Sequence, residues 1–201
     1  MNEMRIIDEG FLEDLIQARR KNESDAHDEL WNGVYVVSPL ANNDHQDLIC
    51  DLIAILREVI KLTGRGRVQP GANVSDRTGE EWMENFRVPD VVVALNGGRA
   101  VEHWEGGPDF LVDVQSPGDE TDAKIPFCGR IGIRELLIIH RDKRRLRLFR
   151  NDGTELLRVE PDAKKWLTSA VVPPAFRRTT AGKKPPTEVR RTDGTPGRWV
   201  V

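Results

Sequence analysis

The sequence is short of the residues that several classes of protein depend on. Its 201 residues include only two cysteines, Cys50 and Cys128, and one tyrosine. Neither cysteine stands in a Cys-x-x-Cys pair, which argues against zinc and favours two small helix-packing residues in a reducing compartment. No run approaches the roughly 20 apolar residues that span a bilayer, and the N-terminus has no apolar signal segment. We therefore expect a cytoplasmic protein that has no membrane partner.

Charge is plentiful but unevenly distributed. Residues 1–123 hold 11 Lys and Arg against 25 Asp and Glu, whereas residues 124–201 hold 19 against 8. The balances of −14 and +11 give the overall net charge of −3. A nucleic-acid enzyme needs such a separation, with acids to hold a metal and bases to hold phosphates. The length suffices for one domain with a sizeable core.

Apolar spacing predicts an α/β (α+β) fold, with helices and strands that alternate along the chain. Asp122 is a candidate N-cap for the third helix, and Pro126 is tolerable there only within the first turn. A Gly-rich segment, residues 96–108, joins the two central strands. Helices are expected at residues 8–20, 44–62 and 122–131, and strands at residues 29–39 (a hairpin about Asn32-Gly33), 67–74, 88–93, 110–115, 135–140, 146–150 and 155–159.

Residues 173–201 differ from the rest of the chain. They are rich in proline, arginine and lysine, which is typical of a disordered basic tail. However, Thr187–Arg191 and Arg198–Val201 flank an Asp193-Gly194 turn, which favours a small hairpin packed on the domain. Both alternatives stay open, and we treat residues 1–172 as the domain and residues 173–201 as a C-terminal extension.

Two apolar strands each carry one aspartate. Asp90 follows Val88-Pro89 and precedes three valines, and Asp113 lies in the run Phe110–Gln115. A carboxylate among apolar residues is costly unless something pairs with it. The two could face one cleft from neighbouring strands, and two carboxylates without His or Cys favour a hard cation such as Mg²⁺. With Lys124 nearby, they would suffice for metal-assisted phosphodiester cleavage, although structural ion pairs also place charges in this way.

At these motifs the chain resembles the Uma (Uma-two) family of restriction endonucleases, in the PD-(D/E)XK nuclease superfamily. The resemblance covers about residues 5–172 and rests on the order and spacing of several runs. These are Glu29–Pro39, His45-Gln46, Arg87-Val88-Pro89-Asp90-Val91, Leu111–Pro117, Lys124, Gly132-Ile133 and Glu135-Leu136. It implies a restriction-endonuclease-like fold, with a mixed central sheet of about five strands flanked by helices.

The resemblance also implies roles for site residues. Asp90 and Asp113 would bind Mg²⁺ or Mn²⁺, with the peptide carbonyl of Val114 as a further ligand. Gln115 stands where the superfamily usually has a lysine, and Lys124 would supply that ammonium from the helix. Glu29 either adds a carboxylate through water or is a surface acid of the hairpin. The chain departs from the family in three places: Asp113 replaces Glu, Cys128 replaces Tyr, and Pro126 interrupts the helix that carries Lys124.

The expected partner is nucleic acid, DNA before RNA, and a homodimer stays open. A basic run is the candidate phosphate contact, although such runs are often only solvated edges. Its members are Arg141, Lys143, Arg144, Arg145 and Arg147. The sequence thus favours a metal-dependent endodeoxyribonuclease. The alternative is an inactive nuclease-fold module that binds DNA or another protein.

Overall fold

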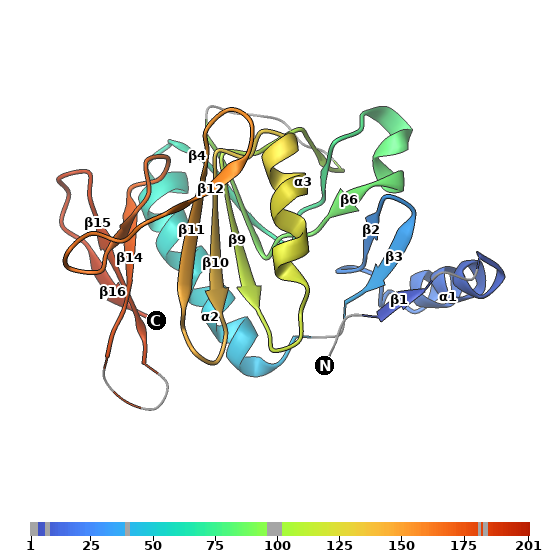
Figure 1. Ribbon diagram of the computed structural model, residues 1–201, viewed down its shortest axis with the longest axis horizontal. Coiled ribbons are helices and arrows are strands. Elements are labelled where there is room, and N and C mark those ends of the chain that lie inside the picture. The colour runs from blue at the N-terminus through green and yellow to red at the C-terminus, as the bar shows by residue number, and fades with distance from the viewer. Residues whose placement is uncertain (1–3, 7–8, 39–40, 96–101, 181, 183–184) are drawn as a thin grey trace.

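The computed structural model describes residues 4–6, 9–38, 41–95, 102–180, 182 and 185–201. Its frame is a mixed six-stranded sheet in the order β12-β11-β10-β9-β7-β4 (Figure 1). Strands β9 and β10 are parallel, and the other neighbours are antiparallel. The mixed sheet is as predicted, but it has six strands where the resemblance implies about five. The strands are β4 (Gly66–Pro70), β7 (Val91–Leu95), β9 (Phe110–Gln115), β10 (Glu135–His140), β11 (Leu146–Asn151) and β12 (Leu156–Val159).

Helix α2 (Asn43–Leu56) covers one face of this sheet and continues as a π-helical segment, Arg57–Lys61. Asn42 caps it by accepting a hydrogen bond from the His45 backbone N–H. Its buried residues, among them Leu48, Leu52 and Val59, pack with Phe110 and other alternate residues of the strands. The predicted helix 44–62 is therefore confirmed. Cys50, which we expected to pack, is instead exposed, whereas Cys128 is buried.

Helix α3 (Ile125–Arg130) covers the opposite face, against the other alternate set of strand residues. It follows a 3-10 helical segment, Thr121–Lys124, and Pro126 falls in its first turn. Amide donors are free there, so the proline starts the helix instead of breaking it. The proposed cap at Asp122 is wrong, because Asp122 lies inside the 3-10 segment.

A second six-stranded sheet, made of short strands, stands beside the first. Asn32 and Gly33 both have positive φ, 49° and 85°, which confirms the predicted hairpin turn between β2 and β3. Pro39 and residues 96–101 of the Gly-rich connection lie outside the described residues. The strands are β1 (Met4–Ile6), β2 (Glu29–Trp31), β3 (Val34–Val37), β5 (Val74–Ser75), β6 (Phe86–Arg87) and β8 (Trp104–Glu105), with α1 (Glu9–Lys21) and a 3-10 segment (Gly79–Glu84) attached.

The C-terminal residues form a third, four-stranded sheet, so the disordered alternative is wrong. Its strands are β13 (Leu167–Thr168), β14 (Pro174–Arg178), β15 (Thr187–Arg191) and β16 (Arg198–Val200), in that order. Phe176 stacks on Phe110 of the central sheet with ring centroids 6.3 Å apart. The pairing of β13 with β14 crosses residue 172, where the composition changes. No helix among the described residues has the length and apolarity that crossing a bilayer requires.

Arg87 ties the second sheet to α3. Its guanidinium lies 4.8 Å from the ring centroid of Trp31 and 4.2 Å from that of Phe127. Its Nη1 donates hydrogen bonds to the carbonyl oxygens of Leu30 and Phe86 and to the side-chain oxygen of Asn85. Burial lowers the pKa of Arg87 to about 10, while the charge of the nearby Glu29 opposes that shift.

We expect Arg87→Ala to lower the free energy of unfolding by about 3–5 kcal/mol, because it removes a buried cation and leaves its partners unsatisfied. Urea unfolding checks this through the midpoint at an unchanged slope. Arg134→Ala is the matched control: Arg134 is exposed and pairs with Asp109, so its loss should cost less than about 1 kcal/mol. Equal losses in the two variants would contradict the role of Arg87.

Candidate active site

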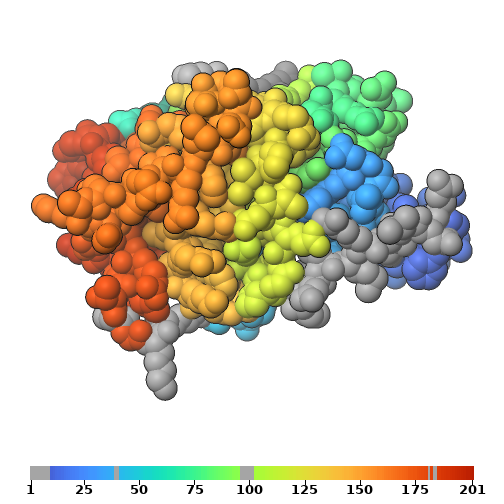
Figure 2. Space-filling model, viewed as in Figure 1, coloured from blue at the N-terminus to red at the C-terminus, as the bar shows by residue number. Residues whose placement is uncertain are grey.

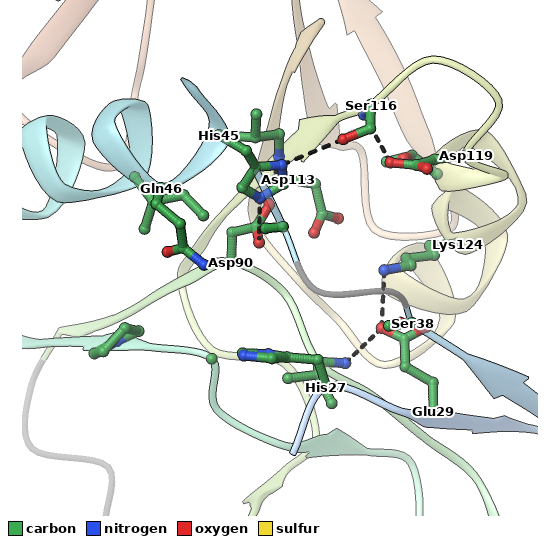
Figure 3. A pocket seen from close by; sticks show the side chains of 17 residues that line it. His27, Glu29, Ser38, His45, Gln46, Asp90, Asp113, Ser116, Asp119 and Lys124 are labelled. Carbon is green, nitrogen blue, oxygen red and sulfur yellow. Dashed lines mark hydrogen bonds and ion pairs between the residues drawn. The ribbon is translucent and has the colours of Figure 1, made fainter. Parts of the chain in front are cut away.

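One cavity opens where the second sheet, α2 and the ends of β7 and β9 meet (Figure 3). Asp90, Asp113 and Lys124, which come from three separate segments, all line it. Glu29 and Val114 line it as well. The remaining lining residues are His27, Ser38, Ala41, His45, Gln46, Ile49, Pro70, Gly71, Val88, Ser116, Asp119 and Thr121. The cavity therefore combines acidic, basic and hydroxyl side chains.

Asp90 directly precedes β7 and is fixed at both of its oxygens. Oδ2 accepts a hydrogen bond from the backbone N–H of Val114 at 2.6 Å, which ties it to β9. Oδ1 lies 3.1 Å from Nε2 of His45, in the first turn of α2, and Nδ1 of that histidine lies 3.4 Å from Ser116 Oγ. The carboxylate is thus held in a fixed orientation at the junction of three elements.

Asp113 projects from the middle of the sheet and is almost fully buried, with 4% of its surface exposed. Its Oδ2 atom has no hydrogen-bond partner among the described residues. Burial raises the pKa of Asp113 to about 7; Lys124 opposes this shift, and the charges of Asp90 and Glu29 add to it. The protein therefore keeps a buried carboxyl group with one oxygen that accepts no hydrogen bond from the described residues, and the nearby charge of Lys124 offsets only part of the cost of its burial.

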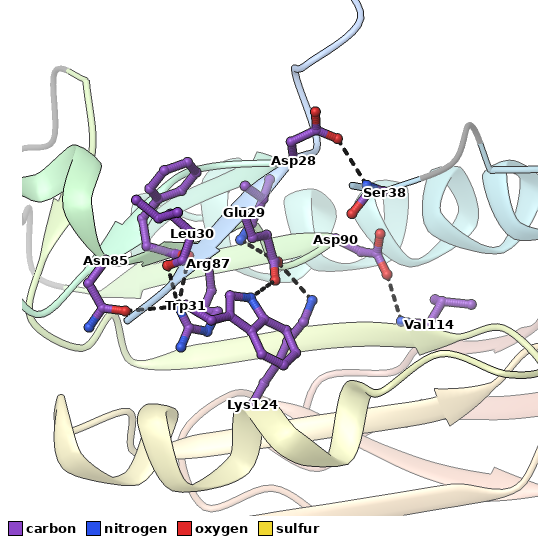
Figure 4. Close-up of polar contacts among 12 residues, drawn as sticks. Asp28, Glu29, Leu30, Trp31, Ser38, Asn85, Arg87, Asp90, Val114 and Lys124 are labelled. Atoms are coloured by element: carbon purple, nitrogen blue, oxygen red, sulfur yellow. Dashed lines mark hydrogen bonds and ion pairs between the residues drawn. The ribbon is translucent and has the colours of Figure 1, made fainter. Parts of the chain in front are cut away.

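Lys124 is held by Glu29, its partner across 95 residues of sequence (Figure 4). Its Nζ donates a 2.8 Å hydrogen bond to Glu29 Oε1. The same carboxylate accepts from the Val88 backbone N–H at 2.7 Å and from Trp31 Nε1 at 2.6 Å. Burial alone would lower the pKa of Lys124, but the charges of Glu29 and Asp113 outweigh it and raise that pKa above its usual value. The ammonium is charged and fixed.

The structure decides whether Glu29 is a site residue or a surface acid, and it shows where the side chain of Gln115 lies. Glu29 is 1% exposed, so its interpretation as a surface acid is wrong. Gln115 lies at the end of β9, where its Oε1 accepts a 3.0 Å hydrogen bond from Arg147 Nη2. It is not among the residues that line the cavity. Val114 lines the cavity, while its N–H is used by Asp90.

Some residues of the basic run are buried or paired within the protein, and others are exposed. Arg144 is only 9% exposed and has φ of 49°, and Arg147 pairs with Asp122 at 2.6 Å. Arg141 reaches the rim of the cavity, where its Nη1 lies 3.4 Å from Ser116 Oγ. Lys143 and Arg145 are exposed. Of the five residues, Arg141, Lys143 and Arg145 therefore stay candidates for a phosphate contact, and the guanidinium of Arg141 also pairs with Asp142.

The donor set suits a hard divalent cation. No group of three or more His, Cys, Asp or Glu side chains is spaced for a metal within the described parts of the chain. Four carboxylates line the cavity, those of Glu29, Asp90, Asp113 and Asp119, and the unpartnered Oδ2 of Asp113 is the atom that a cation would satisfy. Oxygen donors without thiolate suit Mg²⁺ or Mn²⁺. The site therefore fits such an ion on its chemistry.

Sequence reasoning missed two contributors. Asp119 lines the cavity, and its Oδ2 accepts a 2.7 Å hydrogen bond from the Ser116 backbone N–H. The turn Ser116-Pro117-Gly118-Asp119 directly after the Asp113 strand was the available signal. The contact of His45 with Asp90 was also missed, because 45 residues separate the two and only the fold joins them.

Comparisons with known proteins bear on the family and the fold of this chain. A family model described as "Uma2: Putative restriction endonuclease" matches residues 12–181. The chain is also similar to a solved structure from Anabaena variabilis, titled as a "putative nuclease belonging to DUF820". The TM-score is 0.56 at 18% identity, over 71% of this chain and 80% of that one, which shows a shared fold. No curated protein matches. The chain belongs to the Uma2 family, which is described as "Putative restriction endonuclease", and has the restriction-endonuclease-like fold.

Proposed function

We propose that this protein is a Mg²⁺- or Mn²⁺-dependent endonuclease that hydrolyses phosphodiester bonds in DNA. One observation carries the proposal: Asp90, Asp113 with its unpartnered Oδ2 atom, and a charged Lys124 line a single cavity. Membership of the Uma2 family and the likeness in fold support it. The cytoplasm remains the expected compartment, and a homodimer remains open.

Asp90, Asp113 and the peptide carbonyl of Val114 are the groups that would hold the cation. When bound, such an ion polarises the scissile phosphate and lowers the pKa of water at the site. His45 and the Val114 N–H keep Asp90 oriented. Asp113 is held ready because its strand is buried between two helices, which leaves the side chain little freedom.

Lys124 supplies positive charge to the phosphate. The transition state for phosphodiester hydrolysis gains negative charge on the phosphate oxygens, and a prepositioned ammonium stabilises that charge. Glu29 acts as a positioning residue: it fixes the ammonium on one side and the Val88 N–H, two residues before Asp90, on the other. It thereby couples the segment before α3 to the residues that lead into β7, among them Asp90.

A cleavage assay tests this proposal against the inactive alternative. Purified protein is incubated with supercoiled plasmid, single-stranded DNA and RNA, each with Mg²⁺, with Mn²⁺ or with EDTA, and its melting temperature is followed as each metal is added. We expect plasmid nicking with metal only, together with a rise in melting temperature. An intact plasmid in all conditions would favour the module that binds without cleaving, and RNA as the sole substrate would overturn the assignment to DNA.

The metal-free protein should lose stability as the pH rises from about 4 to about 7. In the unfolded chain Asp113 loses its proton near 3.8, whereas the folded protein keeps it to about 7. Between these values the folded state binds more protons, so the free energy of unfolding falls with rising pH. At about 1.4 kcal/mol per pKa unit, the change is on the order of a few kcal/mol.

Urea unfolding in EDTA at pH 5 and pH 8 measures this effect against Asp113→Asn, which has no charge to bury. The variant should gain stability relative to wild type as the pH rises, and this gain should level off above about 7. A constant difference between the two proteins across the range would show that burial does not penalise the Asp113 carboxylate.

A further inference from the structure

A second hollow, of about 270 Å³, lies between the edge of the central sheet and the C-terminal sheet. We name it the basic groove, after the four cationic residues among those that line it. They are Arg145, Arg158, Lys165 and Arg178. Leu146, Val159 and Leu167 contribute apolar surface, and Thr179 and Thr180 contribute hydroxyls. No acidic side chain belongs to this lining, so the basic groove is suited to an anion.

The groups of the basic groove are available to a ligand. All four cationic residues are exposed. Among the described residues, the side chains of Arg158 and Lys165 take part in no hydrogen bond or ion pair. Oγ1 of Thr179 is buried and lacks a partner as well. The carboxylate of Asp162, an acid nearby in sequence, accepts hydrogen bonds from the backbone N–H groups of Lys164 and Trp166 and does not belong to the lining.

The basic groove is joined to the active site by the turn between β10 and β11, residues 141–145. At one end, the Arg141 N–H donates to the Gln115 carbonyl oxygen at 2.9 Å, and its side chain meets Ser116 at the rim of the cavity. At the other end, Arg178 Nε donates to the Lys143 carbonyl oxygen at 2.8 Å. In Figure 2 this turn lies at the lower edge of the molecule, beside the C-terminal sheet.

The distance between the two sites suits one nucleic-acid segment. Asp113 lies on β9, and the basic groove begins at β12, three strands away across β10 and β11. At about 4.8 Å per strand spacing the separation is roughly 14 Å. A duplex rises about 3.4 Å per base pair, so about four base pairs would cover it.

We infer that the basic groove binds the sugar-phosphate backbone of the DNA duplex whose scissile phosphate lies in the active-site cavity. This inference rests on the proposed nuclease function for its choice of ligand. Besides Arg145, at the end of the turn between β10 and β11, the phosphate contacts would then come from β12, from the loop before β13 and from β14. Such binding also gives the C-terminal sheet a role, since Arg178 of β14 forms one wall.

Binding without cleavage tests the basic groove. A labelled 20-base-pair duplex is titrated in EDTA, and affinity is followed by fluorescence anisotropy from 50 to 200 mM salt. Arg158→Gln/Lys165→Gln removes two free cations of the basic groove. Lys61→Gln/Arg67→Gln is the matched control, because it removes two exposed cations, one of them on β4 at the opposite edge of the sheet. Equal melting temperatures confirm that both variants fold.

We expect the variant in the basic groove to lower the slope of log affinity against log salt by up to about 1.8, since each phosphate contact contributes about 0.9. That slope corresponds to a loss of up to about 60-fold at 0.1 M salt. The control should bind as wild type does. Equal slopes in the two variants would overturn the inference. The anisotropy experiment needs no metal and no cleavage. A failure of the basic groove to bind DNA can therefore be distinguished from a failure of the protein to cleave plasmid.

Discussion

Asp113→Asn should reduce metal-dependent DNA cleavage by about 10³-fold or more, which at about 1.4 kcal/mol per tenfold is at least 4 kcal/mol of the barrier. Asparagine keeps the size of the side chain but loses the charge that holds the cation. The buried Oδ2 atom that lacks a partner is the atom affected. Single-turnover plasmid nicking at saturating Mg²⁺ measures the loss, and the rise in melting temperature with Mg²⁺ should disappear in the same variant.

Asp122→Asn is the matched control for this experiment. It removes the same charge from an exposed carboxylate in the 3-10 segment that ends at Lys124, where the partner of Asp122 is Arg147. It should keep cleavage and the metal-induced shift near wild-type values, because Asp122 does not line the cavity. If Asp113→Asn nicked plasmid as fast as wild type, or if both variants lost activity equally, Asp113 would not be the metal ligand.

The sequence allowed good prediction of the elements that depend on local pattern. Helix α2 follows from an apolar face at helical spacing, and the β2–β3 turn follows from Asn32-Gly33, whose positive φ angles that pair tolerates well. The hairpin of β10 and β11 was equally visible, because its two strands are adjacent in the chain. Predicting these elements does not require knowing which distant segments pack together.

Features that depend on distant pairing were out of reach. Strands β5 and β8 are two residues long and pair in parallel across about 30 residues, so no periodicity marks them. The burial of Arg144 could not be read from a basic run that looks like a solvated turn. Glu29 meets Lys124 only because the second sheet docks beside α3, and sequence pattern alone could not show that docking.

Lys124 owes its position to where α3 begins. Pro126 would interrupt a helix that ran from Asp122 through Lys124. Instead the α-helix starts at Ile125, and Lys124 ends the preceding 3-10 segment, where its side chain reaches Glu29. Lys124 serves two purposes in this arrangement: it neutralises a buried carboxylate and places positive charge beside Asp113. An experiment on Lys124 has to separate the two.

We expect Lys124→Ala to slow cleavage by about 10²–10³-fold, comparable to the loss of one donor that stabilises the transition state. It should also destabilise the fold by about 3–5 kcal/mol, because Glu29 is left buried and unpaired. Glu29→Gln/Lys124→Ala removes that unpaired charge, so it should recover much of the stability and none of the cleavage. Urea unfolding and single-turnover nicking measure the two effects separately.

The same pair of variants distinguishes Lys124 from the metal ligands. Because Asp90 and Asp113 are intact, Mg²⁺ should still raise the melting temperature of Glu29→Gln/Lys124→Ala, whereas it should not raise that of Asp113→Asn. Recovery of cleavage together with stability in the double variant would mean that Lys124 only balances the charge of Glu29. Cleavage that stays low in a stable, metal-responsive protein would instead assign the ammonium to the phosphate, since no loss of folding or of metal could then account for the lost rate.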